Sequence, residues 1–368
     1  MEIEDMLSGA ITNDMSLLGG DTGISIFYYN LFKLTDEVQY WKKCQSLTNN
    51  LIDNFPGEGL DQTMGAGYTG IAWGLNFLQG RGIVDFEADY FFSSIDMHIY
   101  IQSLRSLMQR NYDYANGALG ATVHALKRLP DEKAFGYLRQ FVGALKGLQV
   151  VEEHNIRRKI DLPVDLAHSM ANIVNCLTRI YNKDLFKDDI ISLVNEYQTW
   201  LTVFCKEYQY WQDVWDHAAD EKFNCSRHGK ILRIAWSCLQ AGQVFDNEIW
   251  GEEGMKLLQC AGDNYSIINT SDLNASFYNG SAGLAYLFHQ LYKKTSLPVC
   301  LTNHNFWLST TLVKAQYLNK DDGPVSKSHK WDNKYGILTG ACGVGITLID
   351  SLTTGLESWD ECLLLGIS

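Results

Sequence analysis

Prolines, long apolar runs and strand-like alternation are all scarce in this sequence. Five prolines occur among 368 residues, so few positions would interrupt a helix. No stretch approaches the roughly 20 apolar residues that a membrane-spanning helix needs. These absences argue against a membrane-spanning protein and against an all-β fold, and they favour a chain built from helices.

Clustered positive charge is missing as well. Acidic residues outnumber basic ones by 43 to 30, the net charge is −13, and no basic run is longer than Arg157 to Lys159. Binding to phosphates depends on grouped Lys and Arg side chains. We therefore exclude nucleic acid and an anionic membrane as expected partners.

The nine cysteines are scattered, and none forms a Cys-x-x-Cys pair. Most lie in apolar segments, where a free cysteine acts as a small buried hydrophobe. Residues 1–14 are acidic and lack the apolar core of a signal peptide. Together these features predict a cytoplasmic protein with reduced thiols.

What the sequence does contain is a repeat. Five segments read Gly-x-x-Gly followed by an apolar run, and they begin at Gly20, Gly67, Gly117, Gly280 and Gly340. Two degraded copies, residues 169–172 and 230–233, fill the long gap between the third and fourth of these. Seven units of about 50 residues are typical of a solenoid or a closed ring.

Each unit also holds a more charged, amphipathic stretch. The clearest are residues 37–55, 131–148, 185–207 and 247–261. An apolar helix belongs inside a protein, whereas an amphipathic helix belongs outside with one wet face. The pattern predicts an all-α fold, an α/α toroid of seven inner and seven outer helices. We expect one domain over residues 1–368, with 1–15 as an N-terminal extension.

The glycines have a physical reason in such a ring. Glycine at the start of an inner helix lets backbones crowd near the axis, where a Cβ atom would collide. Residues next to the motifs are then expected to line a central cavity. Gly117, Gly280 and Arg227 are candidates for that lining, although close packing alone would also explain the glycines.

Several motifs resemble those of the lanthionine synthetase C-like (LanC-like) family over nearly the whole chain. They are the repeated Gly-x-x-Gly pattern, Asp113-Tyr-Ala-Asn-Gly117, Leu166-Ala-His168, Tyr278-Asn-Gly-Ser-Ala-Gly283 and Trp359-Asp-Glu-Cys-Leu-Leu-Leu365. The resemblance implies an α/α toroid that acts on a peptide carrying dehydroalanine or dehydrobutyrine. In the family a zinc ion, held by two Cys and one His, activates a substrate thiol that closes a thioether ring.

The positions of these zinc ligands are altered here. Carried over by resemblance, the expected Cys, Cys and His become His228, Tyr278 and Asn279. Tyr and Asn are poor zinc ligands, and one imidazole does not hold zinc in water. No cofactor is therefore expected. A displaced zinc site built on Cys225 and His228, a Cys-x-x-His pair, is the alternative.

Two further polar residues keep family positions. His168 falls at the place of the catalytic histidine, and Asp113 falls at the place of an active-site aspartate. A carboxylate and an imidazole facing a cavity could transfer a proton. The structural alternatives are an N-cap role for Asp113 and a satisfied cavity histidine for His168.

Three functions remain open at this point. The first is a metal-free homologue that binds a precursor peptide or assists a partner modification enzyme. The second is an enzyme that adds or eliminates by acid–base chemistry at His168 and Asp113, or at a rebuilt zinc site. The third is a carbohydrate-active toroid, which would need two carboxylates across the ring.

Overall fold

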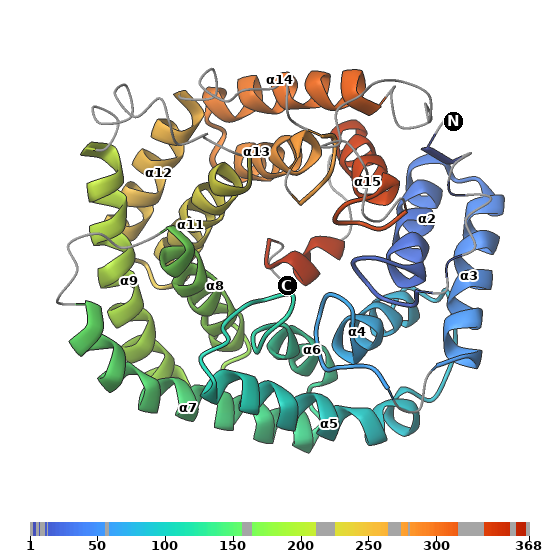
Figure 1. The fold of residues 1–368 in the computed structure, drawn as a ribbon, viewed down its shortest axis with the longest axis horizontal. Helices are drawn as coiled ribbons and strands as arrows, with labels where there is room; N and C mark the ends of the chain where they lie inside the picture. The colour runs from blue at the N-terminus through green and yellow to red at the C-terminus, as the bar shows by residue number, and fades with distance from the viewer. Residues whose placement is uncertain are drawn as a thin grey trace.

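The computed structural model describes residues 14–55, 59–156, 164–210, 225–263, 274–278, 280–315, 335–353 and 358–365, together with Ile3, Glu4, Leu7 and Thr12. Within these ranges the chain is helical and contains no strand. The helices form two concentric layers around a central axis (Figure 1). The all-α toroid predicted from the repeat is confirmed.

Each layer collects one kind of helix (Figure 1). The inner layer holds α2 (Asp21–Thr35), α4 (Tyr68–Gln79), α6 (Gly120–Arg128), α8 (Val164–Tyr181), α11 (Cys225–Val244), α13 (Ser281–Thr295) and α15 (Ala341–Leu352). The outer layer holds α3 (Val38–Asp53), α5 (Ala88–Met108), α7 (Glu132–Ile156), α9 (Lys187–Tyr210), α12 (Glu248–Asp263) and α14 (Pro298–Ala315). Seven inner and six outer helices thus lie in the described part of the chain.

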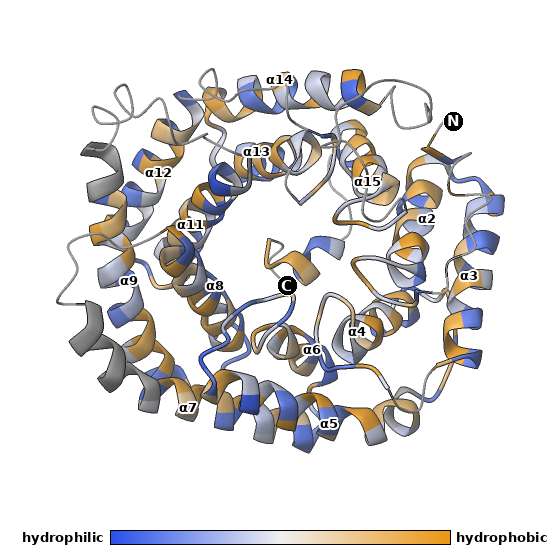
Figure 2. Cartoon of the chain, in the orientation of Figure 1, coloured by the Kyte–Doolittle hydropathy of each residue, from blue (hydrophilic) through white to orange (hydrophobic). Residues whose placement is uncertain are grey.

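The amphipathic stretches became outer helices, as predicted. They correspond to α3, α7, α9 and α12. Figure 2 shows the reason, because these helices alternate between hydrophilic and hydrophobic residues while much of the inner layer is apolar. In α2, for example, every residue from Asp21 to Asn30 is buried. The core is therefore the cylinder between the two layers, where inner helices pack against outer ones.

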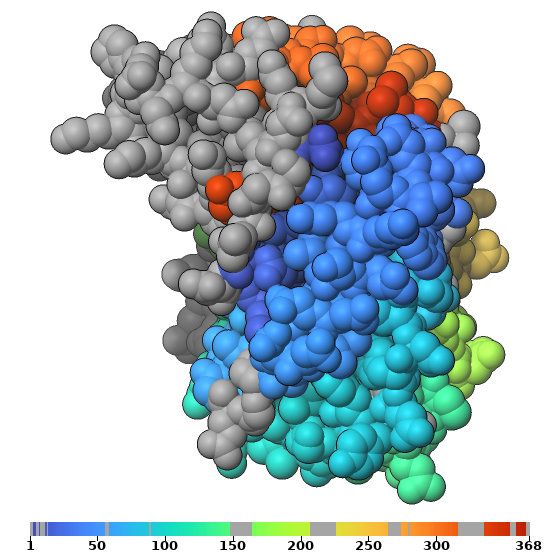
Figure 3. All heavy atoms as spheres, turned by 90° about the vertical axis from the view of Figure 1, so that its right-hand side faces the viewer, coloured from blue at the N-terminus to red at the C-terminus, as the bar shows by residue number. Residues whose placement is uncertain are grey.

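The ring closes where the last inner helix meets the first. Helix α15 contacts α2, and Figure 3 shows α15 lying between α14 and the N-terminal helices on one face. The loops that precede the inner helices are joined by backbone hydrogen bonds. Tyr278 N donates to Leu338 O at 2.8 Å, Leu338 N to Leu18 O at 3.1 Å, Leu18 N to Gly65 O at 3.1 Å, and Gly65 N to Ala115 O at 2.8 Å.

All five of these residues lie two positions before the first glycine of an intact Gly-x-x-Gly motif. The bonds form one chain through the sixth, seventh, first, second and third units. Each inner helix of those units is therefore held to its neighbour at the same height. We call these five segments the lead-in loops.

The lead-in loops share a turn that the sequence analysis missed. An Asp or Asn lies six residues before the first glycine in four of them, at Asp14, Asp61, Asn111 and Asn274. Its side-chain oxygen accepts the backbone N–H two residues on, at 2.8 to 3.2 Å. Its backbone oxygen accepts the N–H of the residue after the glycine, at 2.8 to 3.1 Å. The regular spacing was a visible signal for this turn.

This turn explains the glycines. A Cβ atom on Gly280 would overlap Oδ1 of Asn274, and one on Gly283 would overlap the backbone oxygen of Phe277. Both obstacles belong to the lead-in loop, which is fixed by its own hydrogen bonds. Close approach of backbones is confirmed as the reason for the motif, and it arises mainly within each unit.

The two degraded copies do not start their helices. Helix α8 begins at Val164 and α11 at Cys225, each five residues before the segment aligned with the motif. The expectation that residues 169–172 and 230–233 begin inner helices was wrong. With no glycine pair to stop it, the helix continues toward its N-terminus and lengthens to 18 and 20 residues.

Replacing Gly283 by Ala should strongly destabilise the protein. The new Cβ atom has no room beside the backbone of Phe277, so we expect a loss of about 2–4 kcal/mol in the free energy of unfolding. Gly251→Ala in α12 is the matched control, because nothing lies within 4 Å of its Cβ position. It should gain up to about 1 kcal/mol from helix propensity. Denaturant unfolding checks both, and equal effects of the two changes would contradict the packing argument.

Candidate functional site at the centre of the ring

Residues Trp359–Leu365, which we call the central segment, lie inside the ring (Figure 1). A short 3-10 helix, η3, covers Trp359–Leu363, and every residue of the central segment is buried. The Trp359 ring packs edge-on against Tyr286 and Phe277, with centroids 5.5 and 6.0 Å apart. The segment therefore closes part of the space that the inner helices surround.

The inner helices hold the backbone of this segment. Asn175 Nδ2 from α8 donates to Leu364 O at 2.7 Å. Arg233 Nη1 from α11 donates to Leu363 O at 2.9 Å. Both contacts are made to main-chain oxygens, so they depend little on which side chains the segment carries.

The two carboxylates of the segment are also engaged. Glu361 pairs with Lys127 of α6 at 2.6 Å, and Asp360 Oδ2 accepts the hydroxyl of Tyr286 from α13 at 3.1 Å. Burial raises the pKa of Asp360 to about 6, and the hydrogen bond from Tyr286 opposes that shift only in part. Asp360 therefore carries a costly negative charge at neutral pH.

His168 lies on α8 in a positively charged environment. Burial, followed by the charges of Arg233 and Lys230 from α11, lowers its pKa to about 3, while Asp165 opposes the shift. Among the described residues its buried Nε2 has no hydrogen-bond partner. The imidazole is neutral at physiological pH, and with so low a pKa it is a weak base there.

The carboxylate of Asp113 forms a hydrogen bond within its own lead-in loop. This exposed carboxylate accepts the backbone N–H of Asn116 at 2.6 Å. Ser16 and Thr63 occupy the same position in other units, and their hydroxyls accept the N–H three residues on. Leu119, not Asp113, occupies the N-cap position of the following helix, so the N-cap alternative was wrong. Asp113 is also not among the charges that shift the pKa of His168.

Two of the three positions aligned with zinc ligands are described. His228, in the first turn of α11, is 0% exposed and lies 5.8 Å from the ring of Phe288. Burial alone lowers its pKa to about 4. Tyr278 is 57% exposed, and its backbone takes part in the chain of lead-in loops. Asn279 lies outside the described residues, as does the side chain of Cys225.

These residues fit a zinc ion poorly. No group of three His, Cys, Asp or Glu side chains suited to a metal occurs among the residues that the structure describes. The buried His228 packs on an aromatic ring, and the partners aligned with it are a phenol and an amide. Zinc prefers thiolate and imidazole in a tetrahedral set. We therefore derive no chemistry through a metal.

The remaining cavity candidates can also be located. Arg227 lies on α11 beside His228, and its charge helps to lower the pKa of Asp165 on α8, after the larger effect of Lys230. Gly117 and Gly280 are buried, with their own lead-in loops filling the space next to them. Arg227 thus belongs to the polar face between α8 and α11.

The sequence analysis missed Arg233, Asn175 and the carboxylates of the central segment. One signal was present, because the segment places Asp360 and Glu361 inside an otherwise apolar run. Acidic residues in such a run need buried partners. Which helices supply those partners depends on the closure of the ring, and no local pattern reveals it.

A toroid of helical hairpins with a polar centre is the class of protein that these features define. The sequence model of one family, described as lanthionine synthetase C-like protein, matches residues 11–364. The chain belongs to this LanC-like family. No match was found among curated proteins. In the part of the chain that the structure describes, the helices are too short or too polar to cross a membrane.

Asp360→Asn should stabilise the protein at neutral pH. The pKa of Asp360 is about 6 in the folded protein, above its ordinary value of 3.8, so folding favours the protonated form. The free energy of unfolding of the wild type should then fall by up to about 3 kcal/mol as the pH rises from about 4 to 6, and it should stay lower above pH 6.

Asparagine is neutral and can still accept the Tyr286 hydroxyl, so the variant should escape that cost. Denaturant unfolding of both proteins at pH 4 and pH 7.5 measures the difference. A gain confined to the higher pH is expected. Destabilisation at pH 7.5 would instead mean that the ionised carboxylate is favourably paired.

Proposed function

We propose that this LanC-like protein binds a peptide inside its ring during the maturation of a peptide natural product, without zinc-dependent thioether cyclisation. The peptide is a modified or unmodified precursor. Membership of the LanC-like family supports a peptide as ligand. The central segment supports it on chemical grounds, since the ring already holds one piece of its own chain by main-chain oxygens.

The residues aligned with the zinc ligands support the second half of the proposal. Zinc-dependent cyclisation needs a metal that deprotonates the substrate thiol. Here the aligned set is a buried imidazole, a phenol and an amide. Without thiolate ligands, that set offers zinc little affinity.

The state of His168 argues against its acting as a general base in place of the metal. Efficient proton transfer at neutral pH calls for a pKa near 7. Burial and two cationic neighbours lower the pKa of His168 to about 3. A ligand that brings a negative charge to the ring centre would raise the pKa of His168, so a change in that pKa would indicate that such a ligand is bound.

Metal content before and after restoring the ligands tests the proposal. The wild type should contain close to no zinc by mass spectrometry after dialysis. The triple variant His228→Cys, Tyr278→Cys, Asn279→His should gain about one zinc per chain. Three protein ligands are enough to hold zinc when water or substrate takes the fourth position. His228→Cys alone is the matched control and should remain without zinc.

Peptide binding is measured on the same proteins by titration with dehydroalanine-containing peptides. One zinc per wild-type chain, or turnover of the peptide that His168→Ala abolishes, would make the protein an enzyme and overturn the proposal. Failure of the triple variant to bind zinc would contradict the alignment of the three positions.

A further inference from the structure

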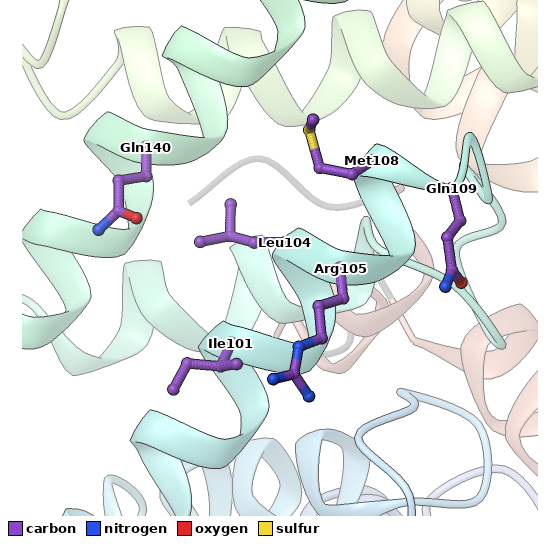
Figure 4. Close-up of a pocket in the computed structure, with 6 residues that line it drawn as sticks. All are labelled: Ile101, Leu104, Arg105, Met108, Gln109 and Gln140. Atoms are coloured by element: carbon purple, nitrogen blue, oxygen red, sulfur yellow. The ribbon is translucent and has the colours of Figure 1, made fainter.

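The outer wall of the ring carries a groove that the proposed function does not use. It lies between α5 and α7, has a volume of about 500 Å³ and is lined by Ile101, Leu104, Arg105, Met108, Gln109 and Gln140. Ile101, Leu104, Arg105 and Met108 belong to α5, Gln109 directly follows that helix, and Gln140 belongs to α7. Figure 4 shows Ile101 and Leu104 pointing toward α7.

One side of the groove is an apolar stripe on a solvent-facing surface. Met97, Ile101 and Met108 are 44%, 43% and 67% exposed, and Leu104 is partly exposed between them. Their spacing of four, three and four residues places all four on one face of α5. An outer helix would normally present polar residues there, so the stripe calls for a covering partner.

Gln140 is the lining residue that α7 supplies, and three glycines lie near it on the same helix. Gly136, Gly143 and Gly147 lie four residues before, three after and seven after Gln140, on the same face of α7. Nothing lies within 4 Å of the Cβ position of any of them. Each glycine costs helix stability without any packing reason inside the chain. A second helix resting against this face would supply that reason.

Charge indicates what kind of helix fits. Over residues 97–109 and 134–147 the Lys and Arg side chains are Arg105, Arg139 and Lys146, and these ranges contain no carboxylate. Lys146 is paired with Asp189 of α9 at 2.5 Å, so Arg105, which lines the groove, is the cation that a ligand would meet there. A second copy that met this groove across a two-fold axis would set one Arg105 against another. A flat lipid surface would not fill a hollow between two helices.

We propose that the α5–α7 groove binds an amphipathic helix of a partner protein, with apolar residues at positions i, i+4 and i+7 and acidic residues along its flanks. The apolar side chains lie between Ile101, Leu104 and Met108, and a flanking carboxylate meets Arg105. The glycines of α7 let the partner backbone approach closely. This inference is independent of zinc loss and of peptide binding in the ring.

A displayed library of helical peptides tests the groove. Every member carries the same leucine stripe over about 20 residues, which is long enough for a helix to form, and its flanks are randomised between Glu and Lys. Selection on the full-length wild-type protein should enrich Glu at the flanks. Enrichment of Lys, or no preference, would overturn the proposal.

Variants then locate the bound peptide. Ile101→Glu should weaken binding of the selected peptide at least tenfold, while Ile191→Glu, at a 39% exposed position on α9, should leave it unchanged. Arg105→Glu should reverse the preference from Glu-flanked to Lys-flanked peptides. Equal binding to the wild type and Ile101→Glu would place the peptide elsewhere and overturn the proposal.

Substituting the glycines of α7 separates an effect on peptide binding from an effect on folding. The double variant Gly143→Ala, Gly147→Ala should melt at the wild-type temperature or slightly above it, yet bind the peptide at least fivefold more weakly. Unchanged peptide binding would remove the role assigned to the glycines. A wild-type dimer in sedimentation that Ile101→Glu dissociates, or wild-type binding to phosphatidylserine vesicles that Ile101→Glu abolishes, would assign the groove to those partners instead.

Discussion

The close approach of each lead-in loop to the start of the helix that follows it is the constraint on which the rest of the structure depends. Five lead-in loops are joined by backbone hydrogen bonds at matching positions, from Tyr278 through Leu338, Leu18 and Gly65 to Ala115. A side chain at the glycine positions would push each loop off its helix. The glycine pairs thus set the height and spacing of five inner helices, and the outer helices pack on the wall so formed.

The two units without glycine pairs are also the units that supply most of the candidate site. Helices α8 and α11 extend five residues beyond the point where the motif would have ended them. That extra turn carries Asp165, Cys225, Arg227 and His228, and the aligned motif positions that follow it contribute Lys230 and Arg233. The longer α11 places His228 on the first turn of a helix, whereas Tyr278 stays in a lead-in loop of a unit that keeps its glycine pair. Helix lengthening therefore accounts for the position of His228 but not for the residues at 278 and 279.

Much of the fold could be predicted from the sequence because its signals are local. Glycine spacing gave the repeat, and apolar periodicity separated inner from outer helices, since each of these patterns reflects the environment of a single element. The ends of α8 and α11 were misplaced because a degraded motif was assumed to keep the role of an intact one. The partners of Asp360 and the anchors of the central segment were not predictable, because Arg233 and Asn175 lie 127 and 185 residues before Asp360 in the chain. Family positions located His168 and Asp113, but the pKa of His168 follows from neighbours on another helix.

Charged side chains of the inner helices and of the central segment meet at the ring centre, where the proposed ligand would bind. Arg179, Arg233 and Lys127 reach this space from three inner helices, and the nearby carboxylates of Asp360 and Glu361 belong to the segment itself. Burial lowers the pKa of Arg233 and of His168 while it raises that of Asp360, so burial disfavours the charged form of each of these groups. The peptide proposed above would enter this same space. A main-chain oxygen of that peptide would be favoured beside Arg233, whereas a further cation would be disfavoured there. The proposed binding through the peptide backbone therefore matches the way in which Asn175 and Arg233 already hold the central segment.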